Sequence, residues 1–210
     1  TLDGCDGCDA ERLVGRERLA DLLGLTGGRE AAFAHYEAVL AALVAAGDRP
    51  GQARLHRKIG GLPWSAGDRE RALRSCQTGL ALLEGQQRHI ELAHLCQEMG
   101  RMAFRAGDNQ RALEWAERAL AHAEALASAP EGVDGGADDT RKEMTAVVAH
   151  AHNTLGIALA RLGKSQEAVG YIERSGKLAE AEGLFQAACR SYSNLGVLYG
   201  TLDPARAIET

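Results

Sequence analysis

The chain has 210 residues, of which 45% are apolar and 25% charged, a composition typical of a globular protein with one or two domains. Its net charge of −5 argues against a general nucleic-acid binder, and its longest apolar run, Ala38–Ala46, is too short to span a membrane. Five scattered cysteines favour a reducing compartment, the cytoplasm, over a disulfide-bonded fold.

In chain order, residues 1–10 are predicted to form a disordered or irregular tail, followed by a repeat region over 11–210. In this region a small residue recurs at positions 20, 60, 100, 156 and 196. In most copies a glycine follows seven residues later and an alanine twelve residues later. The small residues are 40, 40, 56 and 40 residues apart, which indicates about five repeats, the last truncated at Thr210. We therefore expect the chain to be part of a longer protein.

Each repeat is predicted to form two antiparallel helices. Apolar residues lie one residue before and three residues after the small position, a step of four that places them on one helical face. Gly67 and Gly107 are suited to the left-handed conformation that ends a helix, and Asp68 and Asp108 to capping the next one. The small residue itself is expected to let the two helices of a repeat approach closely.

Two places depart from the regular pattern. The interval of 56 residues equals one repeat plus an insertion, which we expect to form a surface loop around 127–140, rich in glycine and aspartate. Pro63 falls inside the expected first helix of the second repeat and is predicted to kink it, because proline lacks the backbone donor that the helix needs.

The recurring small residue, Gly-Asp and alanine resemble the tetratricopeptide repeat (TPR), in a variety with a 40-residue period. This resemblance implies an all-α fold, a right-handed superhelical solenoid of antiparallel helix pairs that binds protein partners on its concave wall. The stretch Ser191–Tyr199 also resembles the repeat region of bacterial multidomain signalling ATPases and cyclases. It raises the alternative of a regulatory sensor segment in such a protein or in a transcription regulator.

Chemical motifs in the sequence are weak. Cys5 and Cys8 have the spacing of a metal or redox pair, but a structural zinc site needs four ligands and the sequence has no second close pair, so metal binding there stays open. The stretch Ala158–Ser165 resembles a loosened phosphate-binding loop, yet its Gly163 falls on a turn between two helices. We therefore expect no enzyme activity and no cofactor.

The resemblance also implies which residues line the concave wall: those six and three before the small position, and one, four and five after it. In the first repeat these positions include the acidic Glu17 and Asp21. From the second repeat onward they hold six arginines and no carboxylate. The candidate binding residues on this wall are Arg54, Arg57, Trp64, His94, Gln97, Arg101, Phe104, Arg105, His150, Asn153, Arg161 and Arg190.

This wall predicts a protein-interaction module that binds an acidic peptide or protein segment. Arginine forks bind carboxylates in a bidentate manner, Asn153 is suited to bond a peptide backbone, and Trp64 and Phe104 are suited to hold an apolar anchor. A second interpretation is that the arginines only pair with acidic residues of neighbouring repeats or face solvent. A third is a self-assembling scaffold, since the last repeat leaves an open end. No nucleic-acid or membrane partner is expected.

Overall fold

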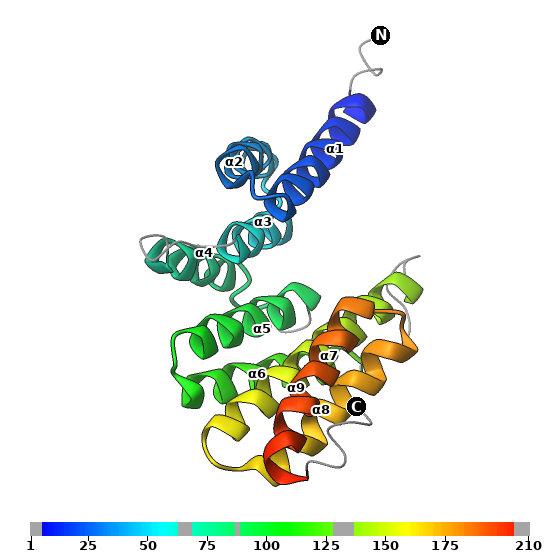
Figure 1. The fold of residues 1–210 in the computed structure, drawn as a ribbon. Helices are drawn as coiled ribbons and strands as arrows, with labels where there is room; N and C mark the ends of the chain where they lie inside the picture. Colours follow the sequence, from blue (N-terminus) through cyan, green and yellow to red (C-terminus); the bar gives the residue numbers. More distant parts are fainter. Residues whose placement is uncertain (1–5, 63–68, 87–88, 128–136, 204–210) are drawn as a thin grey trace. The chain divides into compact units, whose positions relative to one another are not determined.

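The computed structural model describes residues 6–62, 69–86, 89–127 and 137–203, and in these ranges the chain forms nine α-helices and no β-strand (Figure 1). The all-α prediction is therefore confirmed for this part of the chain. The helices in order are α1 Asp6–Leu25, α2 Arg29–Ala46, α3 Arg49–Gly61, α4 Arg69–Leu82, α5 Ile90–Arg105, α6 Asn109–Ala127, α7 Ala137–Arg161, α8 Ser165–Ala181 and α9 Phe185–Leu202. They divide into two compact units, Thr1–Gly85 and Gln86–Thr210.

In the first unit, consecutive helices from α1 to α4 pack on one another. Its core contains the fully buried Ala20 and Ala32 at a helix crossing, with Leu55 of α3 and Val39 of α2 beside them. Alanine at the crossing keeps the helices close, while the longer side chains fill the space around it.

In the second unit, consecutive helices from α5 to α9 pack on one another, and α7 also contacts α5 and α9. The first helices of successive pairs, α5, α7 and α9, therefore form a row. Ile172 of α8 is fully buried against Leu159 of α7 and Leu195 of α9. This packing determines which side chains of α5, α7 and α9 lie next to one another on the surface that these three helices form.

The predicted helix boundary at Gly107 and Asp108 is confirmed. Gly107 adopts a positive φ of 81° after α5, which glycine tolerates better than any other residue. The Asp108 Oδ1 then accepts a hydrogen bond of 3.0 Å from the backbone N–H of Arg111, in the first turn of α6. The corresponding Gly67 and Asp68 lie outside the described residues.

Close helix approach at the small position is confirmed in two repeats. A Cβ added to Gly156 would overlap the Ile172 side chain and lie 3.0 Å from the Ala168 carbonyl oxygen. A Cβ added to Gly100 would lie 3.4 Å from the Ala112 carbonyl oxygen. Helix α7 can therefore pack against α8 only because residue 156 has no side chain.

The structure corrects two details, and a third lies outside the described residues. Helix α1 begins at Asp6, inside the range 1–10 for which we expected an irregular tail. Helices α6 and α7 reach Ala127 and Ala137, so the expected loop around 127–140 is helical at both ends, and 128–136 lie outside the described residues. Helix α3 ends at Gly61, so the predicted kink does not fall within it, and Pro63 lies outside the described residues.

Candidate binding surface

In the first unit, the candidate residue Arg54 already holds an acidic partner. Its Nε and Nη2 atoms each donate a 3.0 Å hydrogen bond to Glu17 of α1. Lys58 of α3 also pairs with Glu17 and with Asp21, at 2.8 Å in both cases. Arg54 thus pairs with an acidic residue of the neighbouring repeat, as the second interpretation of the sequence expected. Arg57 lies on the same helix, and Trp64 lies outside the described residues.

This ion-pair network controls the ionisation of Glu17. Burial raises the pKa of Glu17, but the hydrogen bonds and charges of Arg54 and Lys58 outweigh burial and hold the pKa below its ordinary value of 4.5. Close by, burial and the Asp21 carboxylate, which accepts a 2.6 Å hydrogen bond from the Tyr36 hydroxyl, raise the pKa of that phenol. The pairs therefore join α1 to α3 and are strongest while Glu17 is charged.

Glu17→Gln is expected to destabilise the first unit by about 1–3 kcal/mol at neutral pH, because hydrogen bonds to a charged group are lost. Since the folded pKa of Glu17 is lowered, its contribution is complete above about pH 4.5 and is lost as the pH falls through the folded value. The variant should therefore lose part of this acid sensitivity. Hydrogen exchange of α1 and α3 at neutral and acidic pH measures both effects, with the exposed Glu11→Gln on the same helix as a control that should change neither.

In the second unit, the remaining candidates lie on the row of α5, α7 and α9, and we call this set the basic wall. Two contacts set the register of the three helices. Asn194 Nδ2 of α9 donates a 2.9 Å hydrogen bond to Asn153 Oδ1 of α7, and the Arg161 guanidinium of α7 lies 4.7 Å from the centre of the Phe104 ring of α5. The members of the basic wall are His94, Gln97, Arg101, Phe104, Arg105, His150, Asn153, Arg161 and Arg190.

His150 is the point at which the charges of the basic wall meet. Burial lowers the pKa of His150, and the nearby Arg190, His94 and Arg101 lower it further, to about 4. These neighbours come from α5 and α9, on either side of α7. His150 is therefore a neutral, largely buried imidazole at neutral pH that lies near the cationic Arg190 and Arg101.

Two arginines at this point have no acidic partner within the described part of the chain. Arg105 and Arg190 are both exposed, and neither forms an ion pair there. Desolvation of the guanidinium lowers the pKa of Arg105, the charge of Arg101 lowers it further, the Glu98 carboxylate opposes this, and Arg190 adds a smaller lowering. The charges of Arg105 and Arg190 thus act on each other, and Glu98 offsets only part of the effect on Arg105.

Two carboxylates of this region were missed by the sequence analysis. Glu98 is buried, with 8% of its surface exposed, and both its oxygens accept hydrogen bonds from Arg101, one at 2.9 Å. Glu143 of α7 approaches His94 Nε2 at 3.3 Å, although this buried nitrogen has no hydrogen-bond partner among the described residues. The spacing of three between Glu98 and Arg101 was a signal for the first pair. No local spacing indicates the second.

The other members of the basic wall are less available to contact a ligand than the sequence suggested. Asn153 is buried, with 6% exposed, and its amide oxygen is already bonded to Asn194, which lies nearer the surface. One face of Phe104 is covered by Arg161, a cation–π contact. Gln97 is half-buried on α5. The basic wall is thus chiefly a cationic surface with one partly covered aromatic ring.

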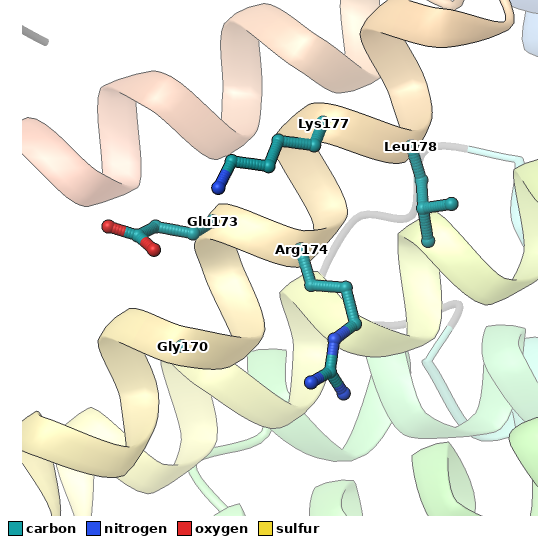
Figure 2. A pocket seen from close by; sticks show the side chains of 5 residues that line it. All are labelled: Gly170, Glu173, Arg174, Lys177 and Leu178. Carbon is teal, nitrogen blue, oxygen red and sulfur yellow. The ribbon is translucent and has the colours of Figure 1, made fainter.

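A hollow of about 450 Å³ lies on α8 and is lined by Gly170, Glu173, Arg174, Lys177 and Leu178 (Figure 2). In Figure 2 the Glu173 and Lys177 side chains extend to the same side of the helix. The Glu173 carboxylate accepts a 2.6 Å hydrogen bond from the Tyr199 hydroxyl of α9. Glu173 therefore helps to hold α8 against α9. No cluster of metal-ligating side chains occurs among the residues that the structure describes.

The helix pairs and their packing define a TPR-like helical-repeat fold. No family model and no curated protein matches the chain. Solved structures do match it. The TPR-like repeats of a Podosopora anserina protein described as a kinesin light chain give a TM-score of 0.64 at 20% identity, over 94% of this chain and 90% of that chain.

Two further structures are similar. BtubC (BKLC) from P. vanneervenii gives a TM-score of 0.58 at 21% identity, over 80% of this chain and 63% of that chain. The MamA protein gives 0.53 at 18% identity, over 95% of this chain and 88% of that chain. At these identities the likeness establishes the fold. None of the helices in the described ranges is long and apolar enough to cross a membrane.

Proposed function

We propose that this chain is a protein-interaction module whose second unit binds an acidic segment of a partner on the basic wall. The observation that carries the proposal is the meeting of cations from α5 and α9 around His150, where Arg105 and Arg190 have no ion pair among the described residues. An acidic segment supplies the missing negative charge.

The first unit supports carboxylate binding by arginines of the wall, and it narrows the place where the partner's acidic segment can bind. There the cations of α3 are already paired with Glu17 and Asp21, which lie at wall positions of the first repeat. These pairs show that a side chain at the Arg54 position binds a carboxylate in bidentate fashion. They also leave Arg105 and Arg190 of the second unit as wall arginines with no ion pair among the described residues.

The energetics require several contacts at once. A single exposed ion pair contributes only about 0.2–1 kcal/mol, so one arginine does not produce a stable complex. Arginine forks that act together on one segment add geometric fit to the charge attraction, and the half-buried ring of Phe104 adds apolar contact. The expected binding is moderate in strength and depends on salt.

Arg105→Ala combined with Arg190→Ala is expected to weaken binding of a glutamate-rich peptide at least about tenfold, because two guanidiniums leave the wall. Fluorescence anisotropy with a labelled oligoglutamate peptide, at low and high salt, measures the loss. Arg101 is a poor choice for this test, since its removal leaves the buried Glu98 without its partner.

The matched control is Arg174→Ala, which removes an exposed arginine from α8 in the same unit. It should leave the affinity unchanged, and a neutral glutamine peptide should not bind. Equal binding of the acidic peptide by the parent chain and the double variant would refute the proposal. The sensor segment and the self-assembling scaffold remain hypotheses that the flanking sequence and the molecular mass in solution test.

A further inference from the structure

The positive charge of the basic wall is concentrated rather than spread along a stripe. Arg190 lies four residues before Asn194, and His150 lies three residues before Asn153, the residue that Asn194 bonds. This register places Arg190 beside His150. Arg101 and Arg105 are one helical turn apart on α5, on the other side of α7. The three arginines therefore approach one place from two helices.

The charges at this place do not balance. Arg101, Arg105 and Arg190 carry three positive charges, and Glu98 carries one negative charge whose oxygens are both bound by Arg101. Three minus one leaves two positive charges. Glu143, which is half exposed, approaches His94 Nε2 at 3.3 Å. A ligand that balances the arginines thus needs about two negative charges at one point.

An extended run of aspartates or glutamates meets this need poorly. Its side chains on one face are about 7 Å apart, so its charges spread along the wall. A phosphate monoester carries about −1.5 to −2 on one group and offers three acceptor oxygens to arginine forks. In the first unit, by contrast, separate carboxylates on Glu17 and Asp21 satisfy Arg54 and Lys58, which lie one turn apart on one helix.

We propose that the segment bound by the basic wall carries a phosphorylated serine or threonine, whose phosphate is held by Arg101, Arg105 and Arg190 above His150. This inference rests on the proposed function, because it names the group that the acidic segment presents. The neutral His150 adds an N–H donor without adding charge. The phosphorylated side chain fits the wall because its charge is concentrated where the arginines converge.

The test uses the full 210-residue chain and three labelled peptides, Gly-Glu-Glu-X-Glu-Glu-Gly, in which X is serine, aspartate or phosphoserine. Anisotropy is expected to show that the phosphoserine peptide binds at least about tenfold more tightly than the aspartate peptide. Arg190→Ala should remove this preference. Arg190→Lys should remove most of it, because lysine keeps the charge but loses the fork. Arg174→Ala should keep it.

The outcomes separate this inference from the proposed function. Equal binding of the phosphoserine and aspartate peptides would overturn the inference that the bound segment is phosphorylated, and it would leave the acidic-segment proposal standing. Failure of all three peptides would overturn both. Free phosphoserine is added as a competitor: weaker binding of the amino acid than of the peptide supports a protein ligand, while equal binding identifies a small phosphate monoester and overturns the peptide. Thermal melting of each variant confirms that it is folded.

Discussion

Lowering the pH from about 7 to about 5 is expected to destabilise the second unit strongly, because His150 and His152 are neutral in the folded chain. Burial lowers the pKa of His150 to about 4, with Arg190, His94 and Arg101 adding to the effect. Burial also lowers the pKa of His152 to about 4, with a smaller effect of Arg174. His152 is 7% exposed, and its Nδ1 has no hydrogen-bond partner among the described residues.

The sign follows from the direction of these shifts. Unfolding restores the ordinary histidine pKa of 6.5, so the unfolded chain binds protons between pH 6.5 and about 4 while the folded chain does not. Stability is complete above pH 6.5 and falls as the pH drops toward 4. A shift of one pKa unit corresponds to about 1.4 kcal/mol, so each histidine contributes on the order of 3 kcal/mol to the loss down to pH 4, and about 2 kcal/mol of it by pH 5.

Chemical denaturation at several pH values, with hydrogen exchange of α7 and α8 as the local readout, measures this effect. His150→Gln and His152→Gln should each reduce the slope of stability against pH below 6.5, because a glutamine takes up no proton. His35→Gln in the first unit is the control and should leave exchange in α7 and α8 unchanged. A second unit equally stable at both ends of this range would contradict the pKa shifts.

Glu17 of the first unit therefore responds to acid in a different window from His150 and His152 of the second unit. The second unit loses stability between pH 6.5 and about 4, where its histidines take up protons on unfolding. The first unit loses the contribution of Glu17 only below pH 4.5, since the pKa of that carboxyl is lowered. An acidic ligand acts in the opposite direction on the second unit, because its negative charge offsets the cations that keep His150 neutral.

The helix pairs were predictable because their signals are local. The turn at Gly107 and the cap at Asp108 depend on residues next to each other in the sequence, and the structure forms both. A small residue is required at position 156 because α8, the next helix in the chain, packs against it. Such features need only the repeat period and the known chemistry of turns and caps.

The state of the candidate site was less predictable because it depends on side chains from separate helices. The sequence placed Arg54, Arg101 and Arg190 on one wall, but their partners differ: Glu17 binds the first, Glu98 binds the second, and the third has no ion pair within the described residues. Wall positions were assigned from the repeat family, and Glu98 is not one of them. The division of the chain into two units at Gly85 has no signal in the repeat period.

Gly156→Ala is expected to destabilise the second unit by about 1–3 kcal/mol, although alanine is the better helix former. The new Cβ would overlap the Ile172 side chain and lie 3.0 Å from the Ala168 carbonyl oxygen. Ile172 is fully buried against Leu159 and Leu195, so it has no free space to rotate into. Relief therefore requires α7 and α8 to move apart, and the packed apolar contacts between them weaken.

The matched control is Gly170→Ala on α8, where an added Cβ would meet no atom within 4 Å. This change should stabilise the helix by up to about 1 kcal/mol, the ordinary gain of alanine over glycine in a helix interior. Thermal melting compares the two variants. Opposite signs identify position 156 as a packing requirement between helices, since the substitution is the same in both. A stabilising Gly156→Ala would show that α7 and α8 adjust without cost and would remove the packing explanation for the small residue.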